Sequence, residues 1–455
     1  MTTTYDPHDP VYLVESDLRE EMVRVYDICH GCRLCFKYCT AFPTLFEYID
    51  SFPSQDAAEM TPEQQDQVVE ECFNCKLCYV NCPYTPGQGH EWNLDFPRLM
   101  LRAEAILVAK ERKLSRERIT TEAVARTDLN GKLGTRLSGV ANKLISKPGS
   151  LPRRVMSKTA GIASQRILPL FARERFSTWF RKRTPSLGRE RQDTVAVFPT
   201  CLVEYNQPAI GHDLVKVYEH NGVECELPEG MQCCGAPWLH SGEIDKFVEQ
   251  GRSNIAALAP HARRGQKIVV PQPTCSYVLK KDYVDYIGGP DAEAVAAATR
   301  DSSEYLIELR KGDDTELADD FDGDVPEQVT YHVPCHLRAQ EIGLKSRDLM
   351  KAAGIKARLV QECSAIDGMW GYKEENYQRS KKVAAKMARG VGQAIKATGV
   401  EVVVGDCHLA NGSIAEETGV IPMHPLQLVA RAYGLPPEPG DRPGFVVGES
   451  TDTGD

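Results

Sequence analysis

The chain has 455 residues, of which 42% are apolar and 26% charged, and a net charge of −10. This length excludes a single ordinary core and predicts two to four domains of a globular protein. No apolar stretch approaches the roughly 20 residues that span a bilayer, and the N-terminus lacks the features of a secretory signal. The sixteen cysteines therefore favour metal or redox chemistry over a disulfide scaffold.

Two near-identical cysteine runs, at 29–40 and 72–83, share the spacing C-x2-C-x2-C-x3-C. A run of this kind delivers three thiolates to one [4Fe–4S] cluster and its fourth thiolate to the neighbouring cluster. The first cluster is therefore assigned to Cys29, Cys32, Cys35 and Cys82. The second is assigned to Cys72, Cys75, Cys78 and Cys39. A pair of zinc sites is the alternative, although zinc usually takes two separate cysteine pairs.

The first run ends in Thr40, whereas the second ends in Pro83. Thr40 either caps a helix or donates a hydrogen bond near the Cys39 sulfur, which would raise the cluster potential. A cap-like Thr61 followed by proline predicts a helix before the second run. Apolar periodicity predicts another helix over 95–113. Residues 1–115 are thus predicted to form a helical ferredoxin domain with two [4Fe–4S] clusters.

Residues 116–193 form a basic segment, called here the basic bridge. Between 132 and 191 it has fifteen Lys or Arg and only two acidic residues. Pro169 is expected to interrupt its helices. Three interpretations stay open: contact with an anionic membrane surface, docking of a soluble partner, or a linker that packs on its own domain. Nucleic-acid binding is not expected, because no recognition motif accompanies the charge.

The C-terminal half contains an internal repeat. Cys201, Cys233 and Cys275 recur as Cys335, Cys363 and Cys407, at offsets of 134, 130 and 132 positions. Each copy alternates strand-like and helix-like stretches, which predicts two α/β units with cysteines at the ends of parallel strands. The units are placed at 194–312 and 327–440, with an acidic joint between them. Residues 441–455 are expected to be a disordered acidic tail.

At "CCGAP", "TCSYVLKKDY", "YHVPCHLRAQEIG" and "GYKEENY" the chain resembles the cysteine-rich CCG domain family. That family includes one of the subunits of heterodisulfide reductase and the iron–sulfur subunits of anaerobic glycerol-3-phosphate, glycolate and lactate dehydrogenases. The resemblance is closest to the glycerol-3-phosphate type. It implies a subunit that takes electrons from a flavoprotein and passes them towards membrane quinone. The fold class is accordingly α+β and multidomain.

Both repeats depart from the family pattern of five cysteines. Val278 replaces the last cysteine of the first repeat, and Ser364 and Ala410 replace two in the second. The first repeat could hold a third centre, either an iron–sulfur cluster or zinc, at Cys201, Cys233, Cys234 and Cys275. In the second, Cys335, Cys363 and Cys407 would need help from His336, His408 or Asp406. The alternative is that these cysteines are structural relics, and Cys225, His332 and His424 are interpreted as structural.

Neither a dinucleotide fingerprint nor a P-loop occurs, so another polypeptide is expected to bind any organic cofactor. The leading hypothesis is an electron-transfer subunit that serves an FAD-dependent dehydrogenase and a membrane or quinone-linked partner. It is expected to be cytoplasmic and peripheral on the inner face of the cell membrane. One alternative is a heterodisulfide-reductase-like catalytic subunit acting at a CCG-bound cluster. Another is a docking scaffold that holds zinc or no metal.

Overall fold

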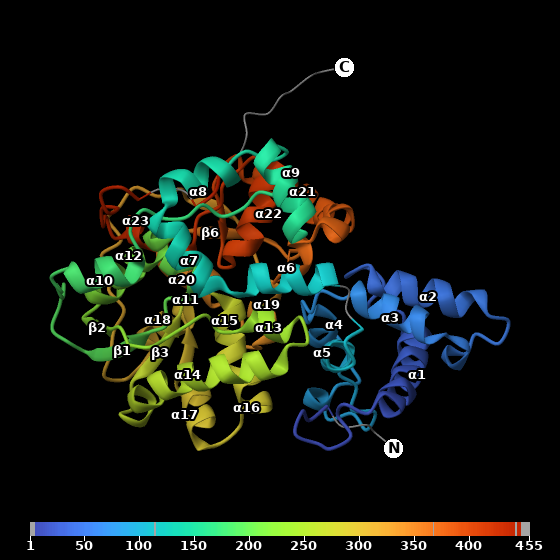
Figure 1. The fold of residues 1–455 in the computed structure, drawn as a ribbon. Coiled ribbons are helices and arrows are strands. Elements are labelled where there is room, and N and C mark those ends of the chain that lie inside the picture. The colour runs from blue at the N-terminus through green and yellow to red at the C-terminus, as the bar shows by residue number, and fades with distance from the viewer. Residues whose placement is uncertain (1–4, 113–114, 367, 442–443, 447–455) are drawn as a thin grey trace.

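The computed structural model describes residues 5–112, 115–366, 368–441 and 444–446. An N-terminal helical part projects to one side, and the basic bridge lies across two α/β units (Figure 1). Residues 442–443 and 447–455 of the predicted tail lie outside the described residues. Close to these gaps, Phe445 is buried and its ring stacks on His408, with 4.7 Å between centroids. This part of the predicted tail is therefore packed against the rest of the protein.

The described N-terminal residues contain only helices and loops. The helices are α1 (Glu15–Cys32), α2 (Ala41–Ser51), η1 (Ala57–Glu59), α3 (Pro62–Glu70), α4 (Leu77–Val80), η2 (Pro86–Gln88) and α5 (Phe96–Ala109). Two predicted helices are confirmed. Thr61 and Gln64 form a capping box at the start of α3, and the Arg98 N–H donates to Asp95 at the start of α5. Apolar faces of α1, α2, α3 and α5 share one core.

The basic bridge contains α6 (Ser115–Ala125), α7 (Thr127–Arg136), α8 (Ser138–Ile145), α9 (Leu151–Ala160) and α10 (Phe176–Lys182). The predicted interruption is confirmed, because Pro169 lies in the non-helical stretch between α9 and α10. Two of the basic side chains are buried. Arg153 donates to the carbonyls of Ile145 and Ala163, and Arg166 donates to the Gly371 carbonyl. The bridge is therefore packed onto the α/β units.

The first α/β unit has a four-stranded parallel sheet in the order β2-β1-β3-β4. Its strands are β1 (Asp193–Val197), β2 (Val223–Glu226), β3 (Lys267–Val270) and β4 (Thr299–Asp301). Its helices are α11 (Thr200–Tyr205), α12 (Pro208–His220), α13 (Ala236–Leu239), α14 (Ile244–Arg263), α15 (Pro273–Tyr277), the π-helix η3 (Val278–Asp282), α16 (Tyr283–Tyr286), α17 (Pro290–Ala298) and α18 (Ser302–Lys311). Apolar residues of both sheet faces are buried beneath these helices.

The second unit repeats this plan with the order β6-β5-β7, again parallel. Its strands are β5 (Gln328–His332), β6 (Lys356–Val360) and β7 (Val403–Gly405). Its helices are α19 (Cys335–Ala339), α20 (Lys345–Ala352), η4 (Trp370–Tyr372), η5 (Glu374–Asn376), α21 (Tyr377–Thr398), α22 (His408–Thr418) and α23 (Pro425–Ala432). In each unit the first strand lies between the second and the third. The predicted duplication with two parallel sheets is therefore confirmed.

Candidate functional site

The first three cysteines of the first run lie near Cys82 of the second run. Cys29 and Cys32 stand in the last turn of α1, and Arg33 turns the chain there with a φ of 53°. Burial raises the pKa of the Cys29 thiol well above its usual value, and the neighbouring Cys35, Cys82 and Cys32 raise it further. The Tyr84 N–H donates to the Cys82 sulfur at 3.4 Å. Together these four thiols form the first cysteine group.

The remaining cysteines of the two runs line one small cavity. These are Cys39, Cys72, Cys75 and Cys78, called here the second cysteine group. Burial raises the pKa of Cys39, and its neighbours Cys72 and Cys75 add to that effect. The two groups adjoin, because Cys35 is among the neighbours that raise the pKa of Cys78. The structure thus brings together the two sets of four that the spacing predicts.

The N-terminus of α2 faces the Cys39 sulfur. The backbone N–H groups of Phe42 and Ala41 donate to this sulfur and hold its pKa down against burial. Thr40 occupies the N-cap position, but its side chain makes no capping hydrogen bond. Its buried hydroxyl has no hydrogen-bond partner among the described residues. The donors near Cys39 are therefore backbone amides of the helix rather than the Thr40 side chain.

The third cysteine group consists of Cys201, Cys233, Cys234 and Cys275 in the first α/β unit. Cys201 lies in the first turn of α11 and Cys275 lies in α15, each shortly after a parallel strand, and the Cys233–Cys234 pair precedes α13. Hydrogen bonds from Cys201 and Cys234 hold the pKa of Cys233 well below its usual value. Cys275 is a hydrogen-bonding neighbour of Cys234. Four neighbouring thiols of this kind suit metal coordination.

A residue of the basic bridge supports this third group. Asp128 of α7 accepts a hydrogen bond from the Cys233 N–H at 2.9 Å and one from the Tyr205 hydroxyl at 3.1 Å. Val278, which replaces the fifth cysteine of the family pattern, is 1% exposed and belongs to the apolar core. The first repeat therefore offers four thiols and no fifth donor at that position.

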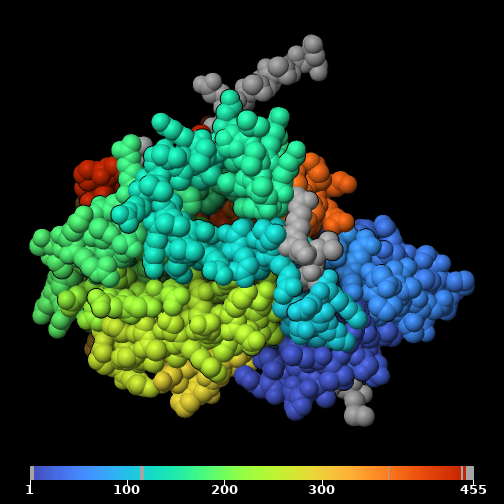
Figure 2. Space-filling view, viewed as in Figure 1, coloured from blue at the N-terminus to red at the C-terminus, as the bar shows by residue number. Residues whose placement is uncertain are grey.

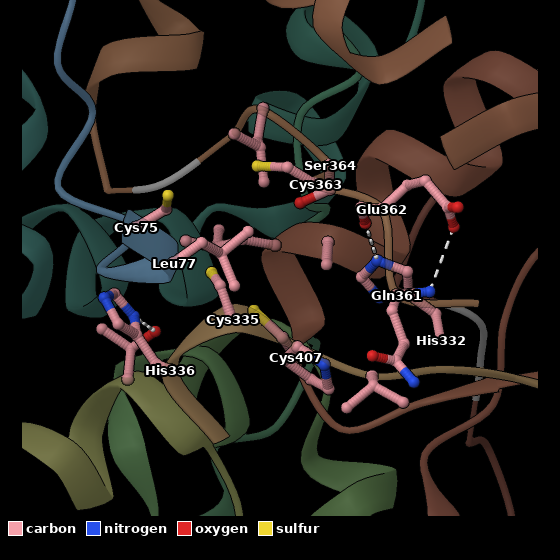
Figure 3. Close-up of a pocket in the computed structure, with 16 residues that line it drawn as sticks. Cys75, Leu77, His332, Cys335, His336, Gln361, Glu362, Cys363, Ser364 and Cys407 are labelled. Carbon is pink, nitrogen blue, oxygen red and sulfur yellow. Dashed lines mark hydrogen bonds between the residues drawn. The ribbon is translucent and has the colours of Figure 1, made fainter. Parts of the chain in front are cut away.

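The fourth cysteine group lies at the carboxyl ends of β5, β6 and β7. Figure 3 shows Cys335, Cys363 and Cys407 around one cavity, with Cys75 of the N-terminal part beside them. Cys75 is the main cause of the raised pKa of Cys363, ahead of burial. Cys75 therefore borders both this cavity and that of the second group. No spacing rule links residues 75 and 363, so the sequence carried no signal for this contact.

The three proposed helpers of the fourth group are arranged differently from the expectation. His336 lines the cavity, but Nδ1 is hydrogen-bonded to Thr274 and Nε2 to the Asn74 carbonyl. Asp406 points away and accepts hydrogen bonds from Tyr331 and Ser346. His408 is buried against Phe445, and burial lowers its pKa to about 3. Ser364 and Ala410 line the cavity where the family has cysteines. Neither Asp406 nor His408 completes the group.

Three residues outside the ligand sets have the structural roles expected of them. Cys225 is a buried residue of β2, and burial raises its pKa. His332 ends β5, and its Nε2 is hydrogen-bonded to the Glu362 carbonyl at 3.0 Å. His424 caps α23 by accepting a hydrogen bond from the Leu426 N–H.

The fourth group connects the second group to the third. The His336 contact to Asn74 joins α19 to the second cysteine loop. Gln272, which precedes α15 of the first unit, donates to the Cys407 sulfur at 3.3 Å. The four cysteine groups therefore form a continuous series, in which the first adjoins the second, the second the fourth, and the fourth the third. Its ends are the projecting N-terminal part and the first α/β unit (Figure 1).

The spacing of the thiols bears on which cofactor they suit. Among the described residues, no three His, Cys, Asp or Glu side chains are close enough to hold one metal ion. A zinc ion requires four ligands about 2.0–2.3 Å from a single centre. An iron–sulfur cluster is larger than one ion, so its thiolate ligands stand further apart. Thiolates are ligands of both zinc and iron–sulfur clusters, so the chemistry of the cysteine groups suits either kind of centre.

Comparison with known proteins agrees with the duplicated architecture. A family model described as "CCG: Cysteine-rich domain" matches residues 195–280 and 329–410. Over 317 residues the chain is 28% identical to the C subunit of anaerobic glycerol-3-phosphate dehydrogenase from Escherichia coli (strain K12), covering 68% of this chain and 76% of the relative.

Two further relatives cover shorter parts. The B subunit of fumarate reductase (CoM/CoB) from Methanothermobacter marburgensis is 27% identical over 260 residues, covering 54% of this chain and 48% of the relative. Lactate utilization protein A of Bacillus pumilus is 25% identical over 221 residues, covering 47% and 87% respectively. A general electron-transfer role in an oxidoreductase system fits these relatives. The chain thus contains the CCG cysteine-rich domain in duplicate and is homologous to these three kinds of protein.

Proposed function

We propose that this chain is the iron–sulfur electron-transfer subunit of an oxidoreductase complex. It takes electrons from an FAD-dependent dehydrogenase subunit that oxidises a small hydroxylated substrate of the glycerol-3-phosphate, lactate or glycolate type. It passes them towards quinone at the inner face of the cell membrane. Two [4Fe–4S] clusters at the first and second cysteine groups, with a further cluster at the third, would supply one-electron transfer.

The observation that carries this proposal is the continuous series of four cysteine groups. A relay needs successive redox positions, and the cysteines at these positions are buried or half-buried. The chain supplies those positions by pairing loops from different parts, as Cys75 of the second group does with Cys363 of the fourth. The amides at the start of α2 would stabilise negative charge on the Cys39 sulfur.

The stretch from α6 to α9 supports a location at a membrane surface. It carries eight exposed large apolar side chains, half of all those found among the described residues: Ile119, Leu129, Leu133, Leu137, Val140, Leu144, Leu151 and Val155. The same stretch carries eight exposed cations: Arg118, Arg126, Lys132, Arg136, Lys143, Lys147, Arg154 and Lys158. Among the described helices, none has the length and apolar character needed to cross a bilayer. This combination suits peripheral binding to an anionic bilayer.

Vesicle binding tests the membrane part of the proposal. Each exposed cation contributes about 1 kcal/mol near an anionic surface, so Lys143→Glu with Lys147→Glu should weaken binding about tenfold or more. Lys311→Glu, an exposed change in the first α/β unit, is the control and should have little effect. Equal binding of both variants to phosphatidylglycerol vesicles would contradict a role for this face.

Purification under anaerobic conditions from the native cells, membranes included, tests the relay. The expected result is flavin in about a 1:1 ratio with this chain, brought by a co-purifying dehydrogenase. The substrate of that dehydrogenase then identifies the pathway. Purified complex that contains iron but neither flavin nor a dehydrogenase would contradict the relay and favour chemistry at the CCG domains.

A further inference from the structure

A large cavity lies between the basic bridge and the third cysteine group. Its volume is about 510 Å³, within the roughly 300–1,000 Å³ typical of small-molecule sites. Helices α6, α7, α8 and α9 and the bridge segment that follows them form one wall, and helices and loops of the two α/β units form the rest. Apolar side chains dominate its lining, among them Val124, Ile145, Met156, Phe171 and Met369.

The described residues that line this cavity include no Asp, Glu, Lys or Arg. A phosphorylated or carboxylated substrate would lose its hydration there without gaining a charged partner, which is strongly unfavourable. By contrast, the pocket on the other side of Cys201 and Cys233 contains Lys132, Arg175 and Arg181. The large cavity therefore selects an uncharged, apolar ligand.

The cavity opens on the face with the exposed apolar and basic side chains. Leu133 of α7 lines the cavity and is also 54% exposed, so it stands at the mouth. Figure 2 shows the cyan and teal surface of the bridge around an opening, with atoms of the red C-terminal part visible at its base. A molecule dissolved in a bilayer that contacts this face would meet the mouth directly.

The floor of the cavity contains all four thiols of the third cysteine group. Gln272 and Thr274 lie beside them and supply polar atoms at the floor, and further uncharged polar side chains, such as Asn130 and Asn206, interrupt the apolar lining elsewhere. A ligand with a polar ring and a long apolar tail matches this distribution, because the ring would face the polar floor while the tail follows the apolar wall to Leu133.

We propose that this cavity binds a prenylated quinone that enters from the membrane. This inference rests on the proposed relay and specifies where its electrons leave the chain. The ring lies beside the cluster proposed for the third cysteine group, near Gln272 and Thr274, and the tail leaves past Leu133. Two electrons from the reduced flavin of the dehydrogenase and two protons from water convert the quinone to its hydroquinone, so no further reactant is required.

Photolabelling of the full chain tests this site without any partner enzyme. The probe is a photoreactive azido-menaquinone analogue in vesicles of phosphatidylcholine and phosphatidylglycerol. We expect label on the peptides that contain α7 and α9. Met156→Trp fills the cavity and should reduce this label about tenfold or more. Val155→Trp alters the neighbouring residue, which is 52% exposed and does not line the cavity, and should retain the label.

A second variant tests the cavity mouth, and two labelling results would overturn the quinone site without bearing on the proposed relay. Leu133→Arg places a charge at the mouth and should also reduce labelling. A chain that binds vesicles but is labelled elsewhere would overturn the quinone site while leaving the relay intact. Labelling of α7 and α9 by a photoreactive phosphatidylcholine that excess menaquinone does not displace would assign the cavity to lipid tails instead. Labelling of the cavity in micelles without vesicle binding would support the site and refute only the membrane docking.

Discussion

Arg166 joins the basic bridge to the second α/β unit, and its removal should release the bridge. The guanidinium is 1% exposed. Its Nε donates to the Gly371 carbonyl at 3.0 Å, Nη1 pairs with Glu416 at 3.1 Å, and Nη2 donates to Ser380 at 2.7 Å. It also lies over the Tyr377 ring, 4.8 Å from the centroid. Arg166→Met keeps much of the apolar stem and deletes every polar contact.

The expected magnitude follows from these contacts. Three hydrogen bonds from a charged donor contribute about 1.5–3 kcal/mol each, but burying the guanidinium offsets part of that sum. Loss of one partner of a buried ion pair usually costs about 3–5 kcal/mol, because the other charge stays buried alone. Glu416 is also mostly buried, at 7% side-chain exposure. Arg166→Met should therefore destabilise docking of the bridge by about 3–5 kcal/mol, and adding Glu416→Gln should recover part of this loss.

Limited proteolysis under native conditions measures the local opening. When the bridge opens and closes rapidly, cleavage follows the population of the open form. A loss of about 3–5 kcal/mol should then speed cleavage within 116–193 on the order of a hundredfold or more. Arg154→Met is the matched control, since Arg154 belongs to the same bridge but is exposed, and its loss should have little effect. Similar cleavage of Arg166→Met, Arg154→Met and the unmodified chain would refute this reasoning.

Three other predictions concern a buried carboxyl and the cysteine groups. Burial raises the pKa of Asp213 to about 7, so the folded state holds a proton that the unfolded state releases near pH 4, and stability falls as pH rises through this window. Asp213→Asn should remove this loss, and its stabilising effect should grow by about 2–3 kcal/mol between pH 5 and pH 8 in thermal unfolding; an equal effect at both pH values would contradict it. Cys39 belongs to the first run but is assigned to the second cluster, so Cys39→Ser should abolish the second cluster, and Cys82→Ser should likewise abolish the first. Each loss should remove one set of paramagnetic resonance signals and about four iron atoms. If Cys39→Ser instead abolished the first cluster, or Cys82→Ser the second, the exchange of the fourth cysteine between the runs would be refuted. Ala41→Pro removes an N–H donor to the Cys39 sulfur at a position where helices tolerate proline, so it should lower a cluster potential, whereas Thr40→Pro should not; equal potentials in both variants would contradict the helix amide effect.

Local features of the sequence predicted the helices and the repeated α/β units well. The capping box at Thr61 and the interruption at Pro169 depend on residues a few positions apart, so the local sequence is enough to predict them. The cysteine offsets of the two repeats agree with the matching strand orders of the two sheets. The assignment of individual cysteines to clusters remains a prediction that the spectroscopy above addresses.

Thr40 shows why a correct position does not establish a contact. The sequence places it at the start of a helix, and it does stand at the N-cap. Its hydroxyl is nonetheless buried without a partner among the described residues, because the backbone there is already in a helical conformation. Side-chain orientation depends on φ and ψ at that one residue, which no sequence pattern specified.

The sequence by itself determined the two cysteine runs, the duplicated α/β plan and the reversal of charge in the bridge. Only the tertiary structure decided that Arg166 is buried and joins the bridge to the second α/β unit, since its hydrogen-bond partner Gly371 is 205 positions away. It alone brought Cys75 beside Cys363 and enclosed an uncharged cavity under the bridge. The physical reason is range: helix and strand preferences arise from near neighbours, whereas cavities and ion-pair burial depend on how distant segments pack together.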